Sequence, residues 1–159
     1  MCARKQAILD EWLERVRNDP SIITSRSLDP ADVLSCLPLI LDNLRASLRG
    51  YGCTTAAEQS AENARQFGTA RSWQGYGLGE LLCEFKHLRS VLIYDMRLFE
   101  DQHSDNGMAA MLFISTVVHR FLDAIMIEAS AEFMSSHTGS VSLPSPRGRS
   151  RRHPVAASG

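Results

Sequence analysis

The chain has 159 residues, of which 44% are hydrophobic and 22% charged, an ordinary composition for one soluble domain with a substantial core. Its formal net charge is −1, but no acidic residue follows Glu132 and four arginines lie near the C-terminus. Removing those four from the 17 basic residues leaves 13 against 18 acidic residues, so the rest of the chain carries about −5. An acidic body argues against a nucleic-acid-binding face on the fold.

The cysteines and the apolar runs indicate the compartment. The four cysteines are widely separated without a CxxC pair, and no secretory leader precedes the first helical pattern. No run approaches 18 uninterrupted apolar residues, so we expect no membrane span. These features predict a reduced, cytoplasmic protein.

Five helical segments and no strand are predicted, which makes the fold class all-α: a five-helix bundle, for which a globin-like arrangement is one option. The first segment, residues 4–18, ends at the sequence Asn-Asp-Pro. The second begins at Asp29 and Pro30, typical residues of a helix start, and ends at Gly50. Pro38 should kink this segment or divide it into a short and a longer helix.

The remaining segments cover residues 55–74, 78–100 and 107–134, and glycines at 75 and 77 close the first of them. Beyond them the chain is rich in Ser, Gly, Pro and Arg and has little to bury. We therefore expect a helical domain over residues 1–136 and a disordered basic tail over residues 137–159.

Charged residues around the glycine turn need an explanation, because burying an ionised group is costly. On a helical wheel Glu84 and Arg89 each lie about 40° from core leucine or phenylalanine positions, whereas Glu80 lies further toward solvent. A very short turn favours antiparallel neighbours, which would bring Arg71 close to Glu80 or Glu84 and let Arg89 reach another helix. The alternative, surface charges with apolar stems, stays open.

The last helical segment is apolar around most of its circumference. Such a helix is either central or covered by a partner, and a helix at the end of a small domain can hardly be wrapped on every side. We therefore expect a homodimer with an interface at Phe113, Val117 and Ala124.

The sequence gives little support for an enzyme or for a cofactor-binding protein. The histidines show no HExxH or HxxxH spacing and no cysteine pairs with them, so we expect no metal site, no cofactor and no catalytic residue. Glu80 and Glu84 could form an acid–base pair, but their spacing after a helix start favours the helix dipole and a nearby arginine. A haem-binding or other small-molecule sensor is an alternative, with His87 and His119 as candidate ligands.

The run GTARSWQGYGLGELLCEFKHLRSVL resembles the signature of the RsbRD N-terminal domain family, found in stressosome co-antagonists and bacterial sensor histidine kinases. The residues that carry the resemblance are Gly68, Arg71, Gly75, Tyr76, Glu80, Leu81, Leu82, Glu84, Leu88 and Arg89. The resemblance covers roughly residues 5–135. It implies an all-helical sensory or regulatory module without catalytic chemistry of its own.

The sequence thus predicts a cytoplasmic, non-enzymatic signal-transduction domain. It would dimerise and pass its signal to a separate kinase or regulatory output protein, with no membrane partner. Besides the haem or small-molecule sensor, one further alternative is a nucleic-acid-associated protein that uses the arginine-rich tail. Four arginines in such a tail would give only non-specific, salt-dependent attraction.

Overall fold

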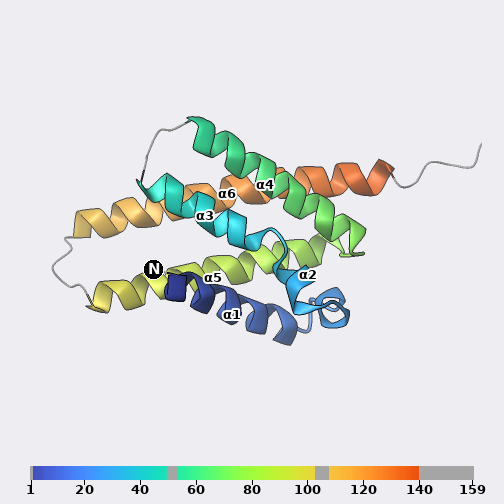
Figure 1. Ribbon diagram of the computed structural model, residues 1–159, viewed down its shortest axis with the longest axis horizontal. Coiled ribbons are helices and arrows are strands. Elements are labelled where there is room, and N and C mark those ends of the chain that lie inside the picture. The colour runs from blue at the N-terminus through green and yellow to red at the C-terminus, as the bar shows by residue number, and fades with distance from the viewer. Residues whose placement is uncertain (1, 50–53, 103–107, 140–159) are drawn as a thin grey trace, which may run out of the picture.

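The computed structural model describes residues 2–49, 54–102 and 108–139, and all of its regular structure is helical (Figure 1). In chain order the elements are α1 (Cys2–Asn18), the 3-10 helix η1 (Thr24–Ser27), α2 (Pro30–Leu34), α3 (Leu37–Arg49), α4 (Thr54–Trp73), α5 (Leu78–Gln102) and α6 (Met108–Gly139). Five of the described helices are long, and α2 has five residues. The predicted all-α helical bundle is confirmed.

The second predicted segment is divided as its proline indicates. α2 ends at Leu34, and the next residue, Ser35, has a φ of 26°, a backbone conformation that residues with side chains seldom adopt. α3 then begins at Leu37, and Pro38 occupies its second position. A proline is tolerated there because the first N–H groups of a helix have no partner within it.

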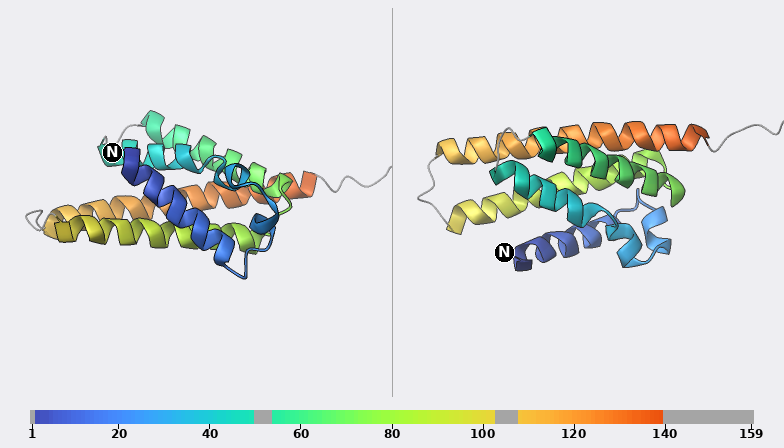
Figure 2. Two further views of the ribbon diagram at one scale, coloured as in Figure 1. Left: turned by 60° about the horizontal axis from the view of Figure 1, so that its bottom comes forward. Right: turned by 45° about the horizontal axis from the view of Figure 1, so that its top comes forward.

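The two longest helices, α5 and α6, run side by side along the length of the molecule (Figure 2). α4 crosses α6 and makes the most extensive contact in the fold, while α1 packs on α5. α3 contacts α1, α4 and α6. The resulting core is continuous and receives side chains from each long helix, among them Trp12, Ile40, Phe67, Leu81 and Ile125.

A glycine sets the distance between α4 and α6. A Cβ atom added at Gly68 would lie 2.1 Å from the backbone carbonyl oxygen of Ala129, and Ala129 is itself fully buried. No side chain is compatible with that separation, so the crossing of the two helices requires Gly68. The first residue of the sequence motif is therefore a packing residue.

α6 departs from the sequence prediction in two ways. It continues as a helix to Gly139, five residues beyond the predicted helix end at residue 134. Residues 140–159 of the predicted tail lie outside the described residues. Within the described chain, α6 is also the one helix long and apolar enough over Met108–Thr138 to cross a membrane, judged by length and composition alone. The expectation that the chain has no such segment is not confirmed.

Candidate functional site

The motif residues meet at the corner where α4 turns into α5. Gly75 has a φ of +81°, the left-handed conformation that glycine adopts without strain. Its N–H donates to the carbonyl of Ser72 at 3.2 Å, and the N–H of Tyr76 donates to the carbonyl of Arg71 at 3.1 Å. This pair of hydrogen bonds is the Schellman ending of a helix, which satisfies the last carbonyl groups of α4.

Glu80 closes the start of α5 and anchors a second element. Its Oε2 accepts a hydrogen bond from the N–H of Gly77 at 2.8 Å, which satisfies a donor at the N-terminus of α5. Its Oε1 accepts from the N–H groups of Ile23 and Thr24 at 2.7 and 2.9 Å, so η1 is tied to α5. Burial opposes ionisation, but these backbone donors hold the pKa of Glu80 below its usual value. Glu80 is thus not the solvent-facing charge that the helical wheel indicated.

A buried ion pair joins α4 to α5. Arg71 Nε donates to Glu84 Oε2 at 2.7 Å, and the two side chains are 0% and 1% exposed. Of the two carboxylates that the sequence offered to Arg71, the structure selects Glu84. Because neither group reaches water, each depends on the other for compensation of its charge.

The remaining atoms of the Arg71 guanidinium hold the end of α2. Nη2 donates to the carbonyl of Val33, and Nη1 donates to the carbonyl of Asp32 at 3.3 Å and to Gln74 Oε1 at 2.7 Å. The guanidinium carbon also lies 4.4 Å from the ring centroid of Phe67 and 4.9 Å from that of Tyr76 (these two rings form its apolar surroundings). Arg71 therefore connects α2, α4 and α5 in one place.

Two polar atoms in this corner are buried without a hydrogen bond within the described part of the chain: Glu84 Oε1 and the hydroxyl of Tyr76. Burial, with the neighbouring Glu84 charge, raises the pKa of Tyr76. Burial likewise raises the pKa of Glu84, against the opposing effect of Arg71. The backbone of Glu84 is fixed from another side, because Trp12 Nε1 donates to its carbonyl at 3.1 Å.

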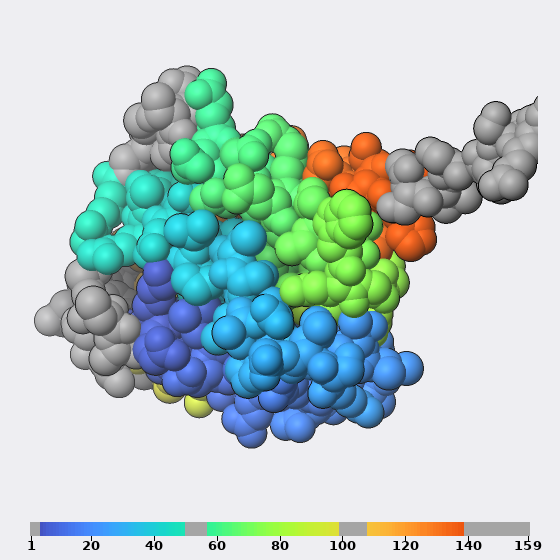
Figure 3. Space-filling view, turned by 45° about the vertical axis from the view of Figure 1, so that its right-hand side comes forward, coloured from blue at the N-terminus to red at the C-terminus, as the bar shows by residue number. Residues whose placement is uncertain are grey.

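The corner is closed on its outer side. In the space-filling view of Figure 3, the light green atoms of the α4–α5 turn lie directly against the blue atoms of η1 and α2. With Arg71 and Glu84 at 0% and 1% exposure, no substrate can touch the pair while the corner is intact. The geometry therefore suits a structural joint better than a catalytic site.

Leu88 and Arg89 continue the motif along α5 with different roles. Leu88 is a core residue with 1% exposure. Arg89 reaches another helix, as predicted: Nη2 donates to Asp123 Oδ1 of α6, and Nη1 lies 3.4 Å from His119 Nδ1. Its side chain is 35% exposed, however, so Arg89 is not buried in the core as its position on the helical wheel indicated.

One ion-pair cluster was missed from the sequence. Asp19 Oδ2 lies 2.6 Å from His87 Nε2 and 3.3 Å from Lys86 Nζ, which ties the residue after α1 to α5. The backbone N–H of Ser21, and after it His87, hold the pKa of Asp19 far below its usual value. The sequence indicates Asp19 only as part of a helix stop, and nothing in it connects Asp19 to a histidine 68 positions away.

Of the three residues expected at the dimer interface, two are exposed and one is buried. Phe113 and Ala124 are exposed on the outer side of α6, but Val117 is only 4% exposed. The prediction for Val117 is therefore corrected. Three helices, α3, α4 and α5, contact α6 and cover a wider arc of it than its central apolar stripe indicates.

No protein-family model matches the chain, and no curated protein or solved structure is significantly similar to it. Within residues 2–49, 54–102 and 108–139, no group of three or more His, Cys, Asp or Glu side chains is arranged to hold a metal ion. A function must therefore be argued from the geometry of the residues themselves.

Proposed function

We propose that this chain is a non-enzymatic regulatory module of bacterial signal transduction, which acts as a homodimer and relays a signal to a separate kinase or other regulatory output protein. The observation that carries the proposal is the apolar outer face of α6. The resemblance of the motif to the RsbRD N-terminal domain family points to the same class of protein.

The α4–α5 corner supports a structural reading of that motif. Gly68 allows the α4–α6 crossing, Gly75 forms the turn, and Arg71 with Glu84 ties α2, α4 and α5 together. Each of these residues is occupied by contacts within the chain. A rigid body of this kind suits a protein that transmits a change through its surfaces.

The outer face of α6 comprises the exposed residues Phe113, Ala124, Ile127, Ala131 and Met134. Phe113, Ile127 and Met134 are 47%, 65% and 56% exposed although each is large and apolar. The last four of these residues recur at alternating spacings of three and four, the pattern by which two helices pack lengthwise. Small alanines between large side chains allow close approach of a second helix.

A second copy of the chain is the simplest occupant of this face. The stretch from Ala124 to Met134 is about 15 Å long, so two copies related by a twofold axis can bury it, while the exposed Arg120 separates it from Phe113. Soluble monomers seldom expose a contiguous apolar patch above a few hundred Å².

We place the protein in the cytoplasm even though α6 is long and apolar. Glu128 of α6 lies 3.1 Å from Arg65 of α4, and Asp123 is paired with Arg89 of α5. Insertion of α6 into a bilayer would break both pairs and bury their charges, at a cost of about 2.5–3.5 kcal/mol for each charged residue near the centre of the membrane.

Light scattering after gel filtration tests the dimer. Wild-type protein should have the mass of two chains, and the double variant Phe113→Glu with Ile127→Glu should have the mass of one while its helical circular dichroism is unchanged. The matched control is Leu82→Glu with Tyr94→Glu, which places two charges on exposed apolar positions of α5 and should leave the dimer intact. A monomeric wild type, or a double variant that stays dimeric, would contradict the proposal.

A further inference from the structure

A surface groove lies between the C-terminal part of α5 and the N-terminal part of α6, the two helices that run side by side in Figure 2. Its volume is about 390 Å³, and it shares no residue with the α4–α5 corner. The α5–α6 groove is lined from both helices, among others by Ile93, Met96, Arg97, Met108, Met111 and Leu112.

The apolar lining of this groove is open to solvent. Met108 and Leu112 are 81% and 63% exposed although both are large and apolar, and Met96 and Met111 are half-buried. Three of the chain's six methionines thus line one groove. Methionine is flexible and polarisable and suits surfaces that adapt to a partner, and exposed apolar surface of this kind marks an interaction site.

The face of α5 beside the groove is basic. Lys86, Arg89 and Arg97 line a second, shallower depression that adjoins the groove, and no carboxylate of the described residues lines either one. Lys86 and Arg89 are compensated by Asp19 and Asp123. Arg97, in contrast, is exposed and has no ion pair or hydrogen bond among the residues that the structure describes. The groove therefore has one uncompensated positive charge at its rim.

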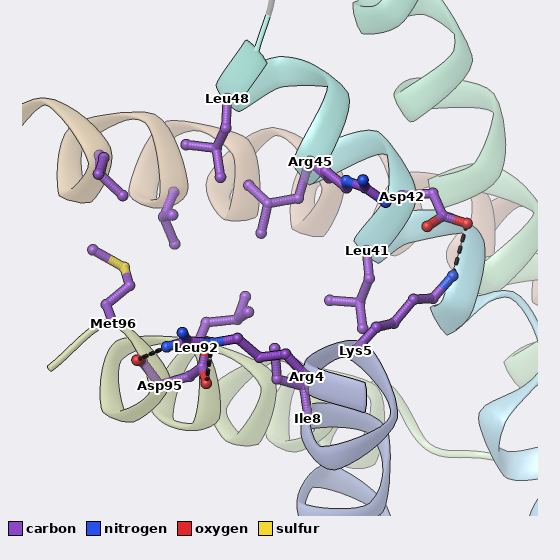
Figure 4. A pocket seen from close by; sticks show the side chains of 13 residues that line it. Arg4, Lys5, Ile8, Leu41, Asp42, Arg45, Leu48, Leu92, Asp95 and Met96 are labelled. Atoms are coloured by element: carbon purple, nitrogen blue, oxygen red, sulfur yellow. Dashed lines mark hydrogen bonds and ion pairs between the residues drawn. The ribbon is translucent and has the colours of Figure 1, made fainter. Parts of the chain in front are cut away.

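A larger, half-open pocket between α1, α3, α5 and α6, with a volume of about 590 Å³, lacks this property (Figure 4). Figure 4 shows Arg4 reaching Asp95 and Lys5 reaching Asp42, at 2.8 and 2.7 Å. Arg45 of the same pocket also interacts within the chain. The charges that line this pocket are satisfied internally, so they do not select an occupant.

We propose that the α5–α6 groove binds an amphipathic helix of the output protein, which places apolar side chains against the methionines and an acidic side chain beside Arg97. A groove between two helices has the shape that a third helix fills, whereas the flat surface of a bilayer does not fill it. From Met108 to His119 the groove follows α6 for about 16 Å, which corresponds to three turns of a bound helix. Charge complementarity at Arg97 then selects an acidic partner.

The groove and the proposed dimer interface are different sides of α6. Met108 and Leu112 lie about 140° and 100° around the helix from Phe113. A second copy bound at Phe113 and Ile127 therefore leaves the groove free for another protein.

This inference rests on the proposed function, because it names the surface through which the module contacts its output protein. The two can fail separately. The variant Phe113→Glu with Ile127→Glu, designed to split the dimer, should still bind a helical peptide in the groove. Variants of the groove should still have the mass of a dimer.

Selection of peptides on the immobilised full chain provides the test, with a phage-displayed library of helical peptides of about 16 residues, which span about 24 Å. Selected sequences should carry large apolar residues at spacings of three and four and acidic residues beside them. Their affinity, measured by fluorescence anisotropy of the synthetic peptides, should fall as salt is added. Failure to enrich any sequence, or enrichment of basic peptides, would overturn the proposal.

Two single variants locate the binding site. Arg97→Glu and Leu112→Glu should each weaken binding of the selected peptides by about tenfold or more, because a like charge or a buried carboxylate then faces the peptide. The matched controls are Arg26→Glu in η1 and Leu39→Glu in α3, two exposed positions away from the groove, and they should bind as the wild type does. Circular dichroism establishes that each variant is folded, and either groove variant suffices alone. Unchanged affinity in a folded groove variant would refute the assignment.

Sedimentation with vesicles of phosphatidylglycerol and phosphatidylcholine separates a helix from a lipid surface as the occupant. The wild-type chain should stay in the supernatant. Sedimentation of the wild type that Leu112→Glu abolishes would assign the groove to a membrane surface and overturn the proposal.

Discussion

Replacement of Arg71 by alanine is the sharpest test of the α4–α5 corner. The substitution removes the only cation paired with Glu84 in the described structure and leaves a carboxylate that is 1% exposed. It also removes the donor to the carbonyl of Val33 and the cation that lies over the rings of Phe67 and Tyr76. We expect a large loss of stability.

The magnitude follows from the burial of the pair. Breaking a fully buried ion pair by removing one partner costs about 3–5 kcal/mol, because an uncompensated charge remains. Glu84 limits this cost by taking up a proton, since burial already raises its pKa. A domain of this size has a total stability of about 5–15 kcal/mol. The loss should therefore lower the Tm by on the order of 10 °C.

Urea and thermal unfolding followed by circular dichroism at neutral pH measure the effect. The matched control is Arg65→Ala on the same helix, because Arg65 is 42% exposed and its pairs with Glu62 and Glu128 lie at the surface. That substitution should cost about 1 kcal/mol or less. Replacing the pair together, as Arg71→Met with Glu84→Leu, should destabilise less than Arg71→Ala, because no charge is stranded. Equal losses for Arg71→Ala and Arg65→Ala would refute the buried strut.

Three further changes give distinct results. Gly68→Ala places a Cβ against a backbone carbonyl of α6 and should lower the free energy of unfolding by about 1–3 kcal/mol or more. The control Gly79→Ala has nothing within 4 Å of its added Cβ and should be neutral or stabilising. Denaturant unfolding compares the two variants. Burial raises the pKa of Glu84 in the folded state, so the free energy of unfolding of the wild type, measured relative to Glu84→Gln, should fall as the pH rises above about 4.5. If it rises instead, the effect of Arg71 on the pKa of Glu84 outweighs the effect of burial. Arg89→Ala should cost about 1 kcal/mol or less, close to Lys86→Ala, because both side chains are partly or largely exposed; a loss several times larger would contradict the surface assignment.

The turn was predictable because its residues act locally. Gly75 is required by a left-handed backbone conformation. The expectation that the short turn makes α4 and α5 antiparallel neighbours is wrong, because α4 packs mainly on α6 and α3 and meets α5 only near the corner. The turn alone brings Arg71 within reach of the first turns of α5. The sequence could not choose between Glu80 and Glu84, because the choice depends on the rotation of α5 about its axis.

The rest of the site depends on contacts between segments far apart in the chain. Glu80 accepts a hydrogen bond from η1, a 3-10 helix that the sequence does not predict, and Asp19 pairs with His87. A helical wheel assumes that each helix is buried on one side only. Val117 shows where that fails, since helices on several sides cover more of α6 than one apolar stripe requires.

The pocket could not be predicted for a similar reason. The apolar residues that line the half-open pocket between α1, α3, α5 and α6, such as Leu44 and Leu92, are ordinary core residues by their spacing, and its charged residues are ordinary surface residues of the same helices. The pocket between these residues exists only because of how the four helices are placed relative to one another. A cavity is a property of the distances between elements, and periodicity within one element does not specify those distances.

The composition of α6 agrees with the two surfaces that we propose for it. One side of α6 is covered by α3, α4 and α5, and the other carries the outer face with Phe113, Ile127 and Met134. A helix with two apolar sides needs few polar positions, so it acquires the length and composition of a membrane span. Asp123 and Glu128 of α6 pair with arginines of neighbouring helices, which supports the proposal that α6 belongs to a bundle outside the membrane. In the proposed dimer, these pairs would fix the rotation of a helix shared between the bundle and a second chain, whereas in a span facing lipid their charges would be buried at a high cost.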